Sequence, residues 1–139
     1  MANKTLRYIS TKMKHLDICM MSTLGSREEL HTRPMSNNKD VKYKGESFFF
    51  SLSDTRKFKD IQREKSVTLS FSGEKGLCII ITGKARLIKS KPILQKHWVP
   101  SLKQWFSDGV DTSDLVLISV KAKVIKSWAN YKEGNIDVE

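Results

Sequence analysis

The pattern of apolar and polar positions changes within residues 46–65, where a strand pattern gives way to a helix pattern. Residues 48–52 contain an apolar, largely aromatic run of strand length, whereas Phe58 and Ile61 have the spacing of one helix face. This change of period predicts that a strand ends and a helix begins near Asp54.

Similar patterns predict elements on both sides of this segment. An apolar period near 3.6 predicts an amphipathic helix over residues 6–18. Two strand patterns joined by the turn GSREE predict a β-hairpin over residues 18–35. In its second strand, alternation places His31, Arg33 and Met35 on one face, and Pro34 predicts an edge position because it cannot donate a ladder hydrogen bond.

The second half of the chain alternates in the same way. Strands are predicted over residues 66–71, 76–89 and 115–124, and the long middle one is expected to bend at Gly83. Residues 92–106 predict two short helices separated at Pro100. The tryptophans of this segment are expected to cover the sheet, or one of them to reach a planar ligand.

These elements predict a single domain over residues 1–139, mostly β with flanking helices. Residues 1–17 would form a leading helix, and residues 129–139 a loose polar tail. No apolar run reaches the roughly 20 residues that a transmembrane helix needs, and no signal peptide is evident, so we expect a cytoplasmic protein without a membrane partner. Cys19 and Cys78 are interpreted as core thiols.

Positive charge narrows the class of ligand. Twenty-five Lys and Arg against fifteen Asp and Glu give a formal net charge of +10, which favours anionic partners. The cations are spread along the chain and no nucleic-acid-binding motif occurs, so a basic nucleic-acid-binding module is the least supported hypothesis.

The predicted helix start after residue 52 combines several groups that bind anions. Ser53 or Asp54 could cap the helix, while Thr55, Arg56 and Lys57 would add a hydroxyl and two cations at its positive end. A phosphate would satisfy the free backbone N–H groups there. Because arginine and lysine are also common on solvated helix faces, the pattern alone leaves both interpretations open.

Motifs for protein-based catalysis are scarce. His15, His31 and His97 stand alone, no metal-ligand spacing occurs, and neither a nucleophile elbow nor a Walker loop is present. No catalytic residue is therefore identified. A phosphate-binding turn in a bent sheet favours a domain whose chemistry is supplied by a bound cofactor.

Four segments together resemble one family. They are HTRPM at residues 31–35, FFFSLSDTRK at 48–57, ITGKARLI at 81–88 and WVPSLKQWFSDGVDTSDLVLISV at 98–120. Their order and spacing resemble the general stress protein branch of the pyridoxamine 5′-phosphate oxidase-like proteins, over about residues 16–128. The resemblance implies an FMN-binding split β-barrel of six antiparallel strands with Greek-key topology.

The resemblance also implies roles for individual residues. Arg33 and residues 55–57 would hold the flavin phosphate. Asn38, with Lys39 adjacent, stands where the family has a further clamp lysine, which implies a weaker grip on the phosphate.

Five further residues are implied to border the flavin ring. Pro34 and Met35 would run beside the isoalloxazine, and Phe50 and Ser51 match a Tyr-Thr pair that borders it. Trp128 matches a tryptophan that family dimers place near the partner's cofactor.

By resemblance, the chain is expected to be a homodimer that holds FMN between its subunits and exchanges electrons with a small molecule. FAD or a deazaflavin are alternative cofactors. The alternative functions are a non-enzymatic flavin- or heme-binding stress protein and a deazaflavin-dependent reductase. Efficient oxidation of pyridoxamine 5′-phosphate is not expected, because true oxidases carry substrate-binding arginine and histidine after the tryptophan, whereas Trp128 is followed by neither.

Overall fold

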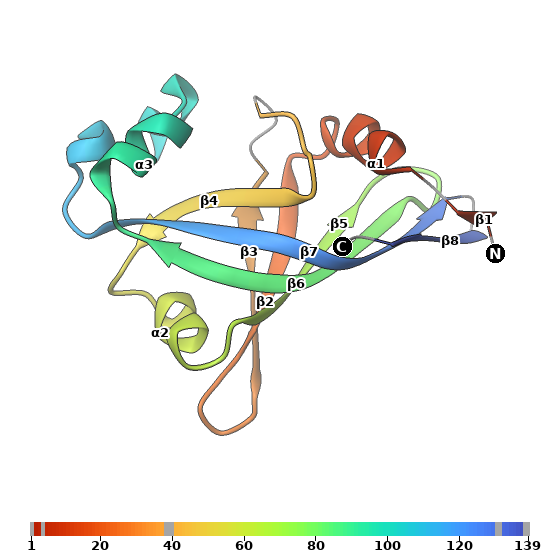
Figure 1. Ribbon diagram of the computed structural model, residues 1–139, viewed down its shortest axis with the longest axis horizontal. Helices are drawn as coiled ribbons and strands as arrows, with labels where there is room; N and C mark the ends of the chain where they lie inside the picture. The colour runs from red at the N-terminus through yellow and green to blue at the C-terminus, as the bar shows by residue number, and fades with distance from the viewer. Residues whose placement is uncertain (1, 4, 38–40, 130–131, 138–139) are drawn as a thin grey trace.

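A computed structural model describes residues 2–3, 5–37, 41–129 and 132–137 of the chain (Figure 1). The strands are β1 (Ala2–Asn3), β2 (Ile18–Leu24), β3 (Leu30–Ser36), β4 (Glu46–Leu52), β5 (Ser66–Ser72), β6 (Cys78–Ile88), β7 (Leu115–Ala129) and β8 (Lys132–Asp137). The helices are α1 (Leu6–Met13), α2 (Arg56–Arg63) and α3 (Lys91–His97), with 3₁₀ turns η1 (Pro100–Gln104) and η2 (Gly109–Asp111).

One continuous sheet contains all of these strands, in the order β1-β8-β7-β6-β5-β2-β3, with β4 also paired to β7. The long strand β7 makes this branching possible, because its first half pairs with β4 and its second half with β8, while β6 runs along its other edge. Among the described residues β3 and β4 do not pair with each other, so the sheet is curved and unclosed (Figure 1).

Curvature of the sheet has a visible local cause in β6. The register between β6 and β7 shifts between Thr82 and Gly83, which marks a bulge. A Cβ at Gly83 would lie 2.2 Å from the carbonyl oxygen of Lys121, so only glycine lets the two strands approach this closely. The bend predicted at Gly83 is confirmed.

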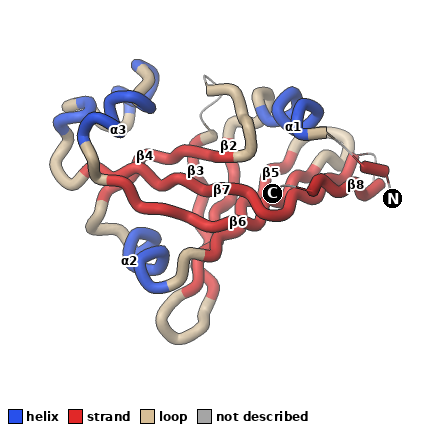
Figure 2. Tube along the Cα trace, viewed as in Figure 1, coloured by secondary structure: helices blue, strands red, loops and turns tan. Residues whose placement is uncertain are grey.

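Two apolar clusters stabilise the fold. The larger cluster fills the inside of the curved sheet beneath α1, and its fully buried members include Ile9, Met21, Leu69, Phe71, Ile81 and Ile125. The smaller one joins the ends of β4 and β7 to α3 through Phe50, Leu94, Leu115 and Leu117, and Leu102 of η1 packs against it. Figure 2 shows the helices at separate corners of the strand network, with α2 and α3 on opposite sides of the end of β4.

The predicted fold class is confirmed: the chain is a mostly antiparallel, split-barrel sheet with flanking helices. Strands β2 to β7 are the six that the resemblance implies, and β1 and β8 extend the sheet beyond them. The hairpin of β2 and β3 and the edge position of Pro34 are also as predicted. None of the described helices is long and apolar enough to cross a membrane.

Two local predictions were wrong. The leading helix ends at Met13, because the Asn37 side chain donates to the carbonyl oxygens of Met13 and Leu16 at 2.9 and 2.7 Å and thereby stabilises a turn. Much of the polar tail is ordered as β8, where backbone pairing with β7 and burial of Ile136 outweigh the polar composition.

Candidate functional site

A cavity of about 800 Å³ lies where β3 and β4 leave the sheet unclosed. This volume is typical of small-molecule and cofactor sites. Its lining includes Asp17, Ile18, Pro34, Met35, Ser36, Phe48, Phe50, Ser51, Thr55, Lys57, Leu102, Gln104, Trp105 and Phe106. The walls therefore come from the start of β2, the end of β3, residues 48–52 of β4, the start of α2 and the η1 segment.

Aromatic contacts fix the β4 wall of the cavity. The Phe48 ring stacks on His97 with centroids 4.1 Å apart, and Phe50 meets Trp98 edge to face at 5.2 Å. Trp105 lines the same cavity and remains 62% exposed. Of the two predicted roles for these rings, Trp98 covers the sheet, whereas Trp105 is placed where it could contact a planar ligand.

The start of α2 lies at one end of this cavity. Thr55 is the N-terminal capping residue, and its hydroxyl donates to the carbonyl oxygen of Leu52 at 2.8 Å rather than capping the helix. The prediction that Ser53 or Asp54 caps α2 was wrong, because the chain enters the helix one residue later. The first-turn N–H groups thus have no side-chain cap, which suits an external acceptor.

Three cations gather around this helix start. Burial lowers the pKa of Lys57, and the charge of Arg33 lowers it further, although Asp54 opposes the shift. Burial likewise lowers the pKa of Arg33; Asp60 raises it, and the charge of Arg56 lowers it. Burial is the largest cause of both shifts, and repulsion between neighbouring cations adds to each, so a bound dianion would relieve that repulsion.

Arg33 is held by a buried polar network. Its guanidinium donates to the Thr23 hydroxyl at 2.8 Å and to the Met21 carbonyl oxygen at 3.3 Å. Thr23 in turn donates to the Asp60 carboxylate at 2.8 Å, and His31 Nδ1 lies 2.7 Å from the same oxygen. Asp60, on α2, therefore links this helix to the strands that present Arg33.

The charge state of Asp60 follows from these contacts. Burial would raise the pKa of its carboxyl, but hydrogen bonds from His31 and Thr23 and the charge of Arg33 outweigh burial and lower the pKa below its ordinary value. Sequence reasoning missed Asp60 and Thr23 and left His31 isolated. The available signal was an acidic residue directly before Ile61, one of the two apolar residues of a predicted helix.

The structure brings most of the predicted ligand residues together. Pro34, Met35, Phe50, Ser51, Thr55 and Lys57 line the cavity. Arg33 and Arg56 are electrostatic neighbours of this cluster without lining the cavity themselves. Asn38 and Lys39 lie outside the described residues.

Trp128 is not part of this cavity within one chain. It pairs with Cys78 and Glu133 in the second half of β7, whereas the cavity borders the first half, where Phe50 pairs with Leu117. A contact between Trp128 and a ligand in such a cavity would need a second subunit.

The two cysteines of the chain lie in different environments, and possible metal ligands are scattered over its described part. No cluster of three or more histidine, cysteine or acidic residues could hold a metal ion there. Both cysteines are free, and burial raises the pKa of Cys19 to about 12, so it is an inert core thiol. Cys78 is only half-buried, so it is not a fully buried core thiol.

Comparisons with known proteins agree with this architecture. A protein from Clostridium acetobutylicum related to general stress protein 26 superposes with a TM-score of 0.81 at 14% identity, covering 94% of this chain and 93% of that one. General stress protein 26 from Bacillus anthracis gives 0.74 at 17% identity, covering 94% and 98%. The general stress FMN/FAD-binding protein from Xanthomonas citri gives 0.76 at 21% identity, covering 96% and 94%.

No match is found among curated proteins. The family model described as "Pyridoxamine 5′-phosphate oxidase like", however, matches residues 4–138, which is nearly the whole sequence. This chain therefore belongs to the pyridoxamine 5′-phosphate oxidase-like family.

Proposed function

We propose that the chain binds FMN in the cavity between β3 and β4 and serves as a flavin-dependent oxidoreductase for a small molecule. The observation that carries the proposal is the meeting of an apolar cavity of about 800 Å³ with the uncapped, cationic start of α2. A flavin mononucleotide has this division, with a planar ring at one end and a phosphate dianion at the other. The similarity to an FMN/FAD-binding stress protein supports the same ligand.

The residues present fit that ligand. Lys57 and the first-turn N–H groups of α2 would bind the phosphate. Arg56 would add positive charge, and so would Arg33, which its hydrogen bond to Thr23 orients. Pro34, Met35 and Phe50 would exclude water from the ring. Bound flavin supplies reversible acceptance of one or two electrons, and the chain's part is to bind it, orient it and leave one ring face accessible.

The first test is direct titration of FMN into the purified protein. If the cavity binds flavin, FMN fluorescence or absorbance should change saturably at micromolar protein, and the complex should be yellow. Absence of saturable binding would reject the proposal. The spectrum of any cofactor that copurifies distinguishes FMN from a deazaflavin or heme, and turnover with a nicotinamide or quinone distinguishes an enzyme from a binding protein.

A homodimer is part of the proposal, because one subunit leaves the cavity incompletely covered. Ile18, Met20 and Leu30 are 50%, 39% and 72% exposed on the outer face of the β2–β3 hairpin, and Ile18 also lines the cavity. A second copy would cover this apolar face, close the cavity and could bring its own Trp128 to the flavin.

We expect light scattering to give about twice the 15.9 kDa chain mass. The double substitution Met20→Glu and Leu30→Glu should shift the protein toward monomer by placing charge in the proposed interface. Val124→Glu, at another exposed apolar position (46% exposed), is the matched control and should leave the mass unchanged. A wild-type monomer that binds FMN tightly would refute a site shared between subunits.

Oxidation of pyridoxamine 5′-phosphate should be at least about a hundredfold slower than in a genuine oxidase. Residues 129–139 hold no arginine or histidine, and Lys132 is their one cation, so these residues offer a substrate phosphate no bidentate partner. Two missing charge-assisted contacts correspond to roughly that loss in kcat/KM. The measurement is pyridoxal 5′-phosphate formation under air by the FMN-loaded protein, and a rate matching a true oxidase would contradict the prediction.

A further inference from the structure

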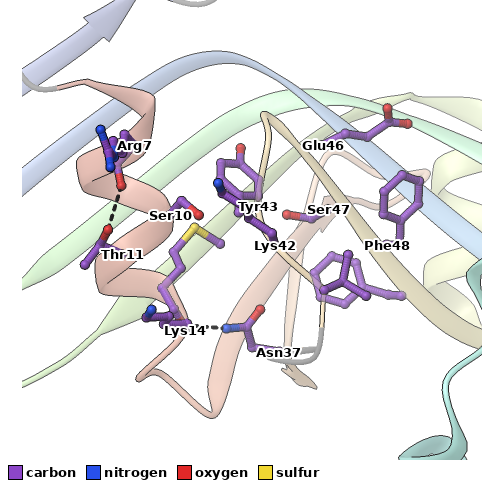
Figure 3. A pocket seen from close by; sticks show the side chains of 13 residues that line it. Arg7, Ser10, Thr11, Lys14, Asn37, Lys42, Tyr43, Glu46, Ser47 and Phe48 are labelled. Carbon is purple, nitrogen blue, oxygen red and sulfur yellow. Dashed lines mark hydrogen bonds between the residues drawn. The ribbon is translucent and has the colours of Figure 1, made fainter.

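A second cavity, of about 410 Å³, lies between α1 and the segment that leads into β4 (Figure 3). Its lining comes from one face of α1, from Asn37, and from residues of the segment 41–49. It shares Asn37, Phe48 and Phe49 with the larger cavity, so the two spaces are neighbours across β4. None of the proposed flavin contacts lies in its lining.

Two buried hydroxyl groups of this cavity have no hydrogen-bond partner. Tyr43 and Ser47 are only 7% and 8% exposed, and neither the Tyr43 hydroxyl nor Ser47 Oγ has a partner in the described part of the chain. An unsatisfied buried hydroxyl is costly, and a native protein rarely leaves two in one place without an occupant that pairs with them. Figure 3 shows both residues within the lining of this cavity, across from α1.

The rim of the cavity determines the charge of that occupant. Arg7, Lys14 and Lys42 are exposed around it, and none of them takes part in the ion pairs found between described residues. The one acidic lining residue, Glu46, already accepts a hydrogen bond from Ser119. Because the three exposed cations outnumber this single carboxylate, the rim of the cavity attracts an anion.

The inner surface of the cavity sets two further requirements for the occupant. Burial, and secondarily the charge of Glu46, raises the pKa of Tyr43 above its usual range, so its hydroxyl stays protonated and can donate. Met13, Val41 and Phe49 form apolar walls beside the hydroxyls. The occupant should therefore present an acceptor oxygen inward and an apolar body to these walls.

We propose that this cavity is a second ligand site, which binds a compact aromatic carboxylate through the Tyr43 and Ser47 hydroxyls under the cationic rim. The carboxylate accepts from the two hydroxyls, and its aromatic ring packs against the apolar walls. The site goes beyond the proposed flavin function and does not depend on it.

Salicylate is a suitable probe of this class. Isothermal titration of salicylate into the full chain should give saturable binding, both without FMN and with the protein saturated with FMN. Raising the salt concentration should weaken binding, because the cations of the rim contribute to it. Absence of saturable heat would overturn the proposal by showing a solvent-filled cavity, and loss of salicylate binding at saturating FMN would overturn it by placing the probe in the larger cavity.

Two variants separate a ligand contact from a structural role. Tyr43→Phe and Ser47→Ala should each weaken salicylate binding about tenfold, which is the expected effect of losing a hydrogen bond to a charged group. Neither should lower the melting temperature of the free protein, since each removes a hydroxyl without a partner. A structural hydroxyl would give the reverse result: a lower melting temperature with unchanged salicylate affinity.

Matched controls lie outside both cavities. Tyr8→Phe and Ser70→Ala make the same chemical changes at residues that line neither space, and salicylate affinity should not change. Equal weakening by a control and its partner variant would contradict the assignment.

Discussion

Replacing Arg56 and Lys57 together with alanine is expected to weaken FMN binding by at least about a hundredfold and to leave riboflavin binding nearly unchanged. Both cations adjoin the uncapped start of α2, and each charge-assisted contact to a phosphate contributes about tenfold or more in affinity. Riboflavin has the same ring without the phosphate, so it senses only the apolar part of the cavity. The measurement is the dissociation constant of each flavin by fluorescence titration.

The control for this experiment removes the same charge from elsewhere on the protein. Lys59 and Lys65 are exposed residues of α2 and of the turn after it, and neither lines the cavity. Replacing both with alanine lowers the net charge equally, so any nonspecific attraction of FMN falls to the same extent. Comparable losses in the control, or equal losses for FMN and riboflavin, would mean that Arg56 and Lys57 do not bind the phosphate.

The position of the cationic helix start was predictable because it depends on local sequence. The change of apolar period near Asp54 depends on only a few residues, and β4 does end and α2 does begin around it. The proline in β3 is an equally local signal, and β3 is an edge strand of the sheet. The glycine bend in β6 is equally local in its signal, although its cause is the approach of Lys121 from a distant strand.

Features that need long-range contacts were not predictable in the same way. The Asp60 network joins α2 to β2 and β3, and only the fold brings Thr23 and His31 to that carboxylate. Strand β8 depends on β7 offering a free edge, which the polar sequence of the tail does not reveal. The larger cavity exists because β3 and β4 do not pair, and this property belongs to the sheet as a whole.

The Asp60 network also predicts a large loss of folding stability in the variant Asp60→Asn. The substitution removes a buried negative charge that accepts from Thr23 and lies 3.9 Å from the Arg33 guanidinium. Removing one member of a buried charged pair typically costs about 3 kcal/mol or more, because the other member is left without compensation. We expect a loss of that size in the free energy of unfolding at neutral pH, measured by urea denaturation.

The pH dependence of the stability loss in Asp60→Asn distinguishes an effect of the lost charge from an effect of altered packing. The pKa of Asp60 in the folded chain is lowered from its ordinary 3.8, so its carboxylate stabilises the fold fully above about pH 4 to 5. This contribution is lost as the pH falls from there through the folded-state pKa, because the unfolded chain binds the proton first. The stability difference between wild type and Asp60→Asn should therefore shrink on acidification. Asp108→Asn, at an exposed residue, is the control and should change stability little at any pH.

Flavin binding should respond to Asp60→Asn through Arg33. With a neutral amide at position 60, the Thr23 hydroxyl has a weaker acceptor and the Arg33 guanidinium loses its nearby negative charge. Arg33 is then held less firmly, and its positive charge beside the start of α2 is less well placed. Under conditions where the variant is folded, FMN affinity should fall by about tenfold while riboflavin affinity changes less. In the proposed flavin complex, Asp60 would therefore be a positioning residue that acts through Arg33 and does not contact the ligand. If Asp60→Asn lowers stability but leaves the ratio of FMN to riboflavin affinity intact, the network supports only the fold, and Arg33 needs no help from α2 to act on the phosphate.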